Sequence, residues 1–189
     1  MNKVNFDNYL WGKDPIQGSK LLVYIAGITT GCFVILFWLF DQVNWPWWQM
    51  MVVALVATDI GSGVVANFLA TTRKFYQDEV LENEPGWSRF IRSPMGFTSI
   101  HIYPILVWLI LTPEMWWVGL VWYGLILGCV ALLVSVPKKL FLAIVGFLLI
   151  VVFLVNAYLL PYPDTLSWFI PLLFIKLTLG HLMPVDYSN

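Results

Sequence analysis

Long runs of apolar residues dominate this chain and alternate with short polar connections. About 20 consecutive apolar residues are enough to cross the hydrocarbon core of a bilayer. The pattern therefore predicts six transmembrane helices, at about residues 20–41, 46–71, 95–112, 115–136, 139–160 and 165–183. These spans occupy most of the 189 residues. We predict an all-α polytopic membrane protein, a six-helix bundle that forms one membrane domain over residues 1–189.

Composition supports the membrane class and bears on the partners. Hydrophobic residues make up 60% of the chain and charged residues 11%, whereas soluble domains hold about 45–50% apolar and about 25% charged residues. The net charge of −1 argues neither for nor against a charged partner. We expect membrane lipids as partners, with another membrane protein or a second copy of the chain as alternatives, and no nucleic acid.

The positions of the lysines and arginines predict the orientation of the chain. They lie before the first span and in the loops after the second and fourth spans: Lys3, Lys13, Lys20, Arg73, Lys74, Arg89, Arg92, Lys138 and Lys139. The alternate connections, 42–45, 113–114 and 161–164, contain none. Because basic loops stay on the cytoplasmic side, we predict that the N- and C-termini are both cytoplasmic. Six tryptophans near the other ends of the spans fit an outer interfacial belt: Trp45, Trp47, Trp48, Trp116, Trp117 and Trp168.

The start of the chain bears on its location. The first 19 residues are polar, and the first apolar run is long enough to span the membrane rather than to act as a signal peptide. We recognise no other targeting signal in this compact chain. These features favour the cytoplasmic (inner) membrane of a bacterium.

One sizeable loop, residues 72–94, connects the second and third spans. Apolar residues recur at helical intervals among its charged residues, which predicts a short helix on the inner surface, broken at Pro85-Gly86. Ser93-Pro94 then predicts an N-cap followed by proline at the first helical position. The loop is either a surface connector, the interpretation we favour, or a lid over a cytoplasmic opening.

Small residues predict which helices approach closely, because helices in lipid associate through tight packing. Gly27 and Gly31 lie one helical turn apart in the first span. The second span carries small residues at four-residue intervals: Ala54, Thr58, Ser62 and Ala66. We therefore predict that the second span is central.

Two charged residues lie at similar depth inside the predicted spans. Asp59 is in the second span and Lys176 in the sixth, both near the midplane of the bilayer. A lone charge there costs at least about 2.5–3.5 kcal/mol, so each needs a partner or water. We predict that Asp59 pairs with Lys176. The pair either fixes the register of two helices or marks a site for a substrate, a proton or an ion.

Other polar residues are predicted to lie in the same, cytoplasmic leaflet. The predicted topology gathers there Asp59, Ser62, Asn67, His101, Lys176 and His181. Tyr103-Pro104 should kink the third span and free a backbone carbonyl near Ile100. The outer leaflet offers little that is comparable. The sequence therefore predicts a polar site that faces the cytoplasm.

This set of residues allows several kinds of chemistry. Asp59, His101 and His181 are the candidate catalytic residues, as acids, bases or orienting groups. The candidate substrate-binding residues are Ser62, Asn67, Lys176, Tyr103 and Arg73. His101, His181 and Asp59 are also of the types that bind a divalent metal, although no His-x-x-x-His spacing supports such a cofactor.

Three classes of function remain open at this stage. The first, which we favour, is an intramembrane enzyme that acts on a lipid or another apolar substrate. The second is a small-solute carrier or the substrate-binding subunit of a transporter. The third is an accessory subunit without catalytic activity, in which the polar cluster holds helices together.

Overall fold

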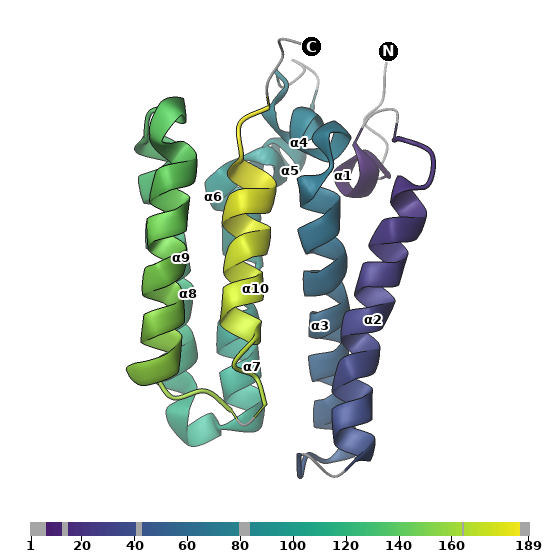
Figure 1. The fold of residues 1–189 in the computed structure, drawn as a ribbon, viewed down its shortest axis with the longest axis vertical. Helices are drawn as coiled ribbons and strands as arrows, with labels where there is room; N and C mark the ends of the chain where they lie inside the picture. The colour runs from purple at the N-terminus through teal and green to yellow at the C-terminus, as the bar shows by residue number, and fades with distance from the viewer. Residues whose placement is uncertain (1–6, 13–14, 41–42, 80–83, 164, 186–189) are drawn as a thin grey trace.

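The computed structural model describes residues 7–12, 15–40, 43–79, 84–163 and 165–185 (Figure 1). Its long helices are α2 (Ser19–Leu39), α3 (Trp47–Phe68), α8 (Trp116–Ser135) and α9 (Phe141–Tyr158). Helices α6 (Pro94–Ile100) and α7 (Tyr103–Leu111) follow each other along one line, and α10 (Phe169–Ile175) continues as a π-helical segment, Lys176–Gly180. The shorter elements are α1 (Asp7–Trp11), α4 (Ala70–Gln77), α5 (Gly86–Arg92) and the 3-10 turns Pro113–Met115 and Lys138–Leu140. The described residues contain no β-strand.

Within the described residues, five helical elements are long and apolar enough to cross a membrane: Ser19–Leu39, Trp47–Phe68, Pro94–Leu111, Pro113–Ser135 and Lys138–Tyr158. They identify a multi-pass membrane protein. The sixth predicted span, 165–183, corresponds to a shorter apolar helix, Phe169–Gly180. By length alone this helix falls below the roughly 20 residues that cross a bilayer.

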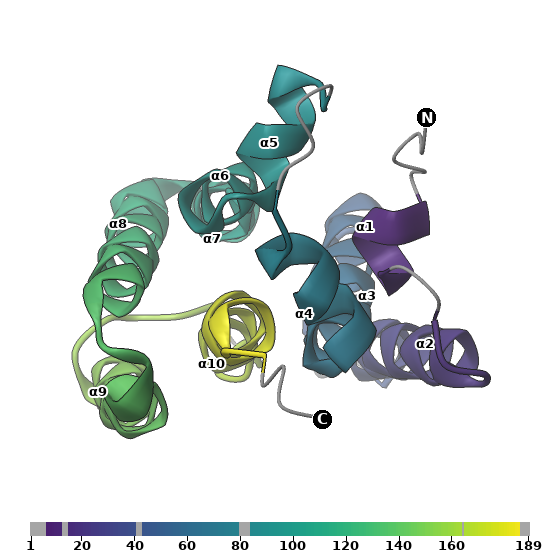
Figure 2. The same cartoon turned by 90° about the horizontal axis from the view of Figure 1, so that it is seen from above.

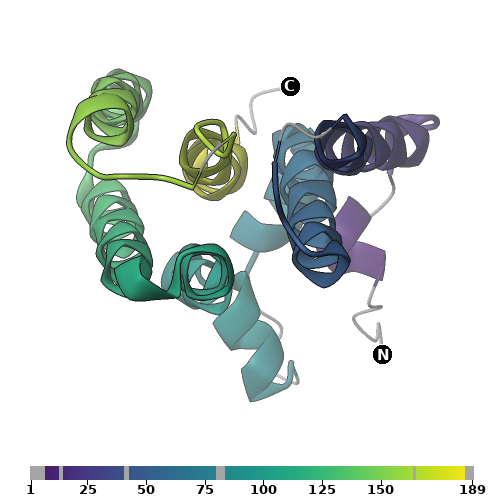
Figure 3. The same ribbon diagram turned by 90° about the horizontal axis from the view of Figure 1, so that it is seen from below.

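The short sixth helix lies inside the bundle. Helix α10 and its π-helical continuation pack against α3, α8 and α9, and Figure 2 shows α10 between the α8–α9 pair and α3. Figure 3 shows the same order from the opposite end, with α2 outermost beside α3. Since nearly every side chain from Phe169 to Gly180 is buried or half-buried, protein rather than lipid surrounds this helix.

Helices α2 and α3 pack closely through glycines, as the small-residue pattern predicts. A Cβ on Gly27 would lie 3.1 Å from the Cβ of Ser62, and one on Gly31 would lie 3.3 Å from the carbonyl oxygen of Ala54. Of the five spanning helices, α3 has the largest buried share. The prediction that the second span is central is therefore confirmed.

The tightest α2–α3 contact predicts a steric effect on stability. A Cβ on Gly61 would lie 1.8 Å from the Thr30 hydroxyl oxygen and 2.9 Å from the Ala26 carbonyl oxygen. We expect Gly61→Ala to lower the free energy of unfolding by about 1–3 kcal/mol, because overpacking forces the two helices apart. Gly146→Ala is the matched control, since a Cβ there meets no atom within 4 Å. Thermal unfolding in detergent micelles measures both, and equal melting temperatures would contradict the expectation.

The third predicted span is broken rather than kinked. Helix α6 ends at Ile100, His101 departs from helical geometry, and α7 restarts at Tyr103 with Pro104 in its first turn. The predicted start is confirmed: the Ser93 hydroxyl accepts a hydrogen bond from the Gly96 amide at 3.0 Å. Proline in the first turn cannot donate to the preceding carbonyls, so the break lies where the sequence predicts a distortion.

The loop after the second span contains the predicted helices, with a different boundary. Helix α3 ends at Phe68, not at residue 71, because Leu69 adopts an extended conformation and α4 starts at Ala70. Helix α5 begins at Gly86, so the second half of the loop is helical after Pro85. Both short helices lie across one end of the bundle (Figure 1).

The two ends of the bundle differ in composition. One end, here called the basic end, carries the described loop cations Lys20, Arg73, Lys74, Arg89, Arg92, Lys138 and Lys139. Lys3 and Lys13 lie outside the described residues. The opposite end carries exposed tryptophans, namely Trp47, Trp48, Trp116 and Trp117. This distribution is the one that the sequence pattern predicts for the two faces of a membrane.

Candidate functional site

A cavity of about 490 Å³ lies between the α2–α3 pair and the α6–α7 pair. Helix α3 contributes Asp59, Ser62 and Asn67 to its wall, and His101 and Tyr103 come from the break between α6 and α7. Lys176 reaches the cavity from the start of the π-helical segment. Helices α1, α4 and α5 close the basic end of the cavity. We call this space the cleft.

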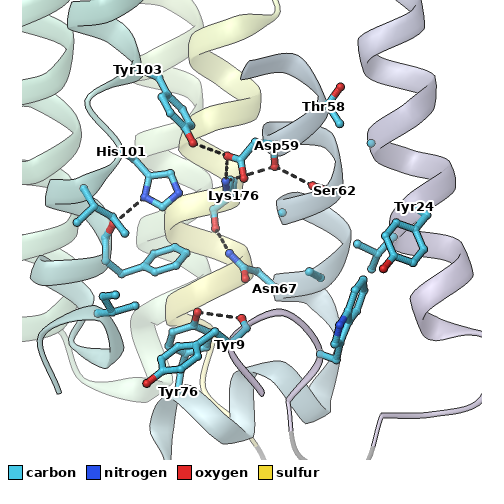
Figure 4. A pocket seen from close by; sticks show the side chains of 18 of the residues that line it. Tyr9, Tyr24, Thr58, Asp59, Ser62, Asn67, Tyr76, His101, Tyr103 and Lys176 are labelled. Atoms are coloured by element: carbon cyan, nitrogen blue, oxygen red, sulfur yellow. Dashed lines mark hydrogen bonds and ion pairs between the residues drawn. The ribbon is translucent and has the colours of Figure 1, made fainter. Parts of the chain in front are cut away.

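Asp59 and Lys176 form the predicted ion pair (Figure 4). The Lys176 ammonium donates to Asp59 Oδ2 and lies 3.3 Å from the Asp59 carbonyl oxygen. The Tyr103 hydroxyl donates to the same Oδ2 at 2.9 Å. The two sides of the pair differ in exposure: the Lys176 side chain is 3% exposed, whereas the Asp59 side chain is 46% exposed. The carboxylate therefore faces the cleft and the ammonium is enclosed by protein.

The local backbone makes room for the lysine. A Cβ on Gly63 would lie 2.3 Å from the Lys176 Cε atom, so the glycine lets the lysine side chain pass close to α3. The Lys176 carbonyl accepts a hydrogen bond from Asn67 Nδ2 at 3.1 Å. A π-helical turn also starts at Lys176, and such turns shift the helical register and are frequent at functional sites.

His101 lies at the helix break, with its two ring nitrogens in different surroundings. Nδ1 is 2.7 Å from the Phe97 carbonyl oxygen, and since a carbonyl only accepts, Nδ1 carries the proton. The neutral ring then presents Nε2 as an acceptor, on the side where Figure 4 shows Asp59 and Lys176. The His101 ring is 5.4 Å from the Tyr103 ring. His101 is thus oriented as a base beside the ion pair.

The structure separates His181 from this group. The His181 ring stacks on Phe97 with centroids 4.1 Å apart, and the Phe97 ring also contacts His101, with centroids 4.6 Å apart. His181 lines a second cavity of about 300 Å³, which also includes Arg92 and Lys138, and it does not line the cleft. The depth of a residue along its helix groups His181 with His101, but depth does not give the side of the helix on which His181 lies.

Of the remaining candidate binding residues, three line the cleft and one does not. Ser62 lines the cleft, and its hydroxyl donates to the Asp59 carbonyl at 3.1 Å. Asn67 and Tyr103 also line it. Arg73 does not: it lies on α4, where its Nε and Nη1 atoms are buried without a hydrogen-bond partner among the described residues, and burial lowers the pKa of the guanidinium. The prediction that Arg73 belongs to this polar site is therefore not supported by the geometry.

The candidate metal ligands are not arranged as a metal site. Within the described ranges, no group of three or more His, Cys, Asp or Glu side chains is close enough to hold an ion. His181 lines the second cavity rather than the cleft, and Asp59 is engaged by Lys176 and Tyr103. The residues present do not match the three protein ligands that a catalytic zinc needs.

Sequence reasoning missed the wall that α1 provides. Tyr9 and Trp11 line the cleft from this short helix. The Tyr76 hydroxyl donates to the Tyr9 carbonyl at 3.0 Å, and the Thr71 hydroxyl donates to the Trp11 carbonyl at 3.1 Å. Burial raises the pKa of the Tyr76 phenol, which stays a neutral donor. The two aromatic residues in an otherwise polar segment were the available signal, but a five-residue helix has no periodicity to reveal its buried face.

The assembled site combines two proton acceptors and an apolar wall. Asp59 supplies a carboxylate held by Lys176 and Tyr103, and His101 supplies a ring nitrogen that accepts protons. Such a pair of acceptors suits proton transfer to or from a bound group. Comparison with models of protein families, with curated proteins and with solved structures finds no match. The functional interpretation rests on the cleft itself.

Proposed function

We propose that this protein is an intramembrane enzyme that takes an amphipathic substrate from the bilayer into the cleft and acts on its polar group. One observation carries the proposal: the carboxylate of the ion pair faces the cleft while its lysine is enclosed. A pair that only fixed helix register would gain nothing from an open carboxylate, because exposure weakens the attraction between the charges. The open side is where a ligand would bind.

The mouth of the cleft supports a substrate from the membrane. Residues that line it on the outer surface of the bundle are apolar or aromatic and exposed, namely Tyr24 and Ile28 on α2, Trp87 on α5 and Ile100 on α6. In a bilayer, such a surface between two spanning helices faces lipid. The volume of about 490 Å³ lies within the roughly 300–1,000 Å³ of small-molecule sites. A substrate with an apolar chain and a polar end fits both the apolar mouth and the polar interior of the cleft.

The proposed chemistry is acid–base catalysis. His101 accepts a proton from the substrate at Nε2, because its Nδ1 proton is held by the Phe97 carbonyl. Asp59, held in place by Lys176 and Tyr103, orients the polar group and stabilises the positive charge that develops on the imidazole. Ser62 and Asn67 fix the backbone around the pair.

The proposal includes a location and an orientation. The basic end faces the cytoplasm, with both termini on that side, because short basic loops are retained there. The cleft then opens in the cytoplasmic leaflet of a bacterial inner membrane. Lipids of that leaflet are the expected partners, and another membrane protein or a second copy of the chain would pack on the exposed apolar faces.

The first test identifies the small molecules that the protein retains when it is extracted from the membrane. The wild-type protein is extracted with its surrounding lipid in polymer nanodiscs, and the bound molecules are identified by mass spectrometry. We expect Ile100→Trp to narrow the mouth and to reduce retention of an amphipathic molecule about tenfold, which is about 1.4 kcal/mol of binding free energy. Ile102→Trp is the matched control, since Ile102 is 49% exposed, like Ile100 at 46%, but does not line the cleft.

Catalysis is tested separately with His101→Gln. In liposomes made from a total lipid extract, the wild-type protein should change the amount of the retained species, and His101→Gln should slow this change by at least about 100-fold. Transfer of the molecule across the bilayer without a chemical change would favour a carrier instead. Retention of a protein partner and of no small molecule would favour an accessory subunit and would refute the proposal.

A further inference from the structure

The hydrogen bonds around Asp59 leave an imbalance between donors and acceptors in that part of the cleft. The donors are used within the protein: Tyr103 and Lys176 bond to Asp59, Ser62 bonds to the Asp59 carbonyl, and Asn67 Nδ2 bonds to the Lys176 carbonyl. Lys176 directs two of its three N–H groups at Asp59, and the third belongs to a side chain that is only 3% exposed. Little donor capacity near Asp59 remains for a ligand.

Acceptors, in contrast, remain open to the cleft. In the described part of the chain, Asp59 Oδ1, Asn67 Oδ1 and His101 Nε2 have no hydrogen-bond partner, and none of them is a fully buried atom. Both side-chain hydrogen bonds to the Asp59 carboxylate go to Oδ2. An acceptor that a ligand desolvates without pairing costs about 1–3 kcal/mol. The polar group of the ligand must therefore donate hydrogen bonds.

Charge decides between a neutral and a cationic donor. Asp59 is already neutralised by Lys176, and the cleft lining contains no other acidic residue in the described part of the chain. A ligand ammonium would add a second, uncompensated cation near Lys176 at membrane depth, which is costly. A hydroxyl satisfies the same acceptors without adding charge.

We infer that the cleft binds amphipathic alcohols, with the hydroxyl donating to Asp59 Oδ1 or His101 Nε2 and the hydrocarbon chain passing through the mouth into the bilayer. This inference rests on the proposed function and names its substrate class. In it, the hydroxyl proton points at His101 Nε2, which is placed to accept it. The class includes long-chain and isoprenoid alcohols and lipids with a free glycerol hydroxyl.

The test uses three probes of one chain length with the purified full-length protein: dodecanol, 1-methoxydodecane and dodecylammonium. Binding is measured in detergent micelles by native mass spectrometry. We expect dodecanol to bind about tenfold more tightly than the ether, because the ether leaves the acceptors unpaired. We expect dodecylammonium to bind no more tightly than the ether.

Variants test whether the preference for the alcohol over the ether comes from the open hydrogen-bond acceptors of the cleft. His101→Phe should remove much of the preference for the alcohol while ether binding is retained, and ether binding also reports that the variant is folded. Asn67→Leu removes another of these acceptors, Asn67 Oδ1. Ile100→Trp should weaken all three probes, whereas Ile102→Trp should weaken none.

The outcomes separate this inference from the proposed function. If the alcohol and the ether bind equally and Ile100→Trp weakens both, the cleft is a ligand site but the inference of an alcohol is wrong. If the ammonium binds most tightly, the charge argument is wrong and the inference falls. If no probe binds, or if Ile100→Trp has no effect, the cleft is not the binding site and the proposed function fails with it.

Discussion

Replacement of Asp59 by leucine should lower the free energy of unfolding by about 3–5 kcal/mol, because it leaves the Lys176 ammonium buried without its counter-charge. Lys176 is 3% exposed and its ammonium is bonded to Asp59 alone among the described residues. The backbone carbonyl of residue 59 would remain, but a carbonyl dipole does not compensate a full charge. Unfolding in mixed micelles with increasing dodecyl sulfate measures the loss.

The opposite replacement, Lys176→Met, should cost less, about 1–3 kcal/mol. It leaves Asp59 facing the cleft, where water reaches the carboxylate and Tyr103 still donates to it. The double variant Asp59→Leu with Lys176→Met should be more stable than Asp59→Leu alone, since no buried charge remains. The enclosed Lys176 and the open Asp59 imply that the two single variants lose different amounts of unfolding free energy. Equal losses, or a loss in the double variant that is the sum of the two, would contradict this expectation.

The sequence predicted the long helices well because each is an uninterrupted apolar run of spanning length. Helices α2, α8 and α9 lie within a few residues of the predicted spans. The sixth span was predicted too long because Leu166 is apolar yet lies outside the helix, in a turn that protein covers. Hydropathy alone does not distinguish a residue that is buried in protein from one that faces lipid.

The candidate site was predictable in part. Asp59 and Lys176 were paired from their depth, because two opposite charges at one level in a membrane have few other ways to be stabilised. The depth of a residue does not give the rotation of its helix about the helix axis, so His181 was grouped with His101. In the structure Phe97 contacts both rings, but His101 lines the cleft and His181 lines the second cavity. The proline after Tyr103 predicted where the helix is distorted, but not that the break would orient His101.

A second buried ion pair, at the basic end, leads to the other large expected effect. Arg92 Nη1 donates to Glu84 Oε2 at 2.6 Å, and Arg92 Nη2 donates to the carbonyls of Phe75 and Asp78, both at 2.7 Å. Both side chains are almost fully enclosed, with 3% and 0% exposure. Glu84→Ala removes the counter-charge of an enclosed guanidinium and should lower the free energy of unfolding by about 3–5 kcal/mol.

The same replacement should loosen the wall of the cleft. Glu84 also accepts a hydrogen bond from Ser88, and Ser88 accepts one from Tyr9, so the pair connects α5 to α1. We expect Glu84→Ala to speed hydrogen exchange in α1 and α4 while α8 and α9 are unchanged, because only the former depend on this network. Lys139→Ala is the control: Lys139 is exposed at the basic end, and an exposed side chain contributes within about 0.5 kcal/mol. If Glu84→Ala behaved like this control, the pair would not hold the basic end of the cleft closed.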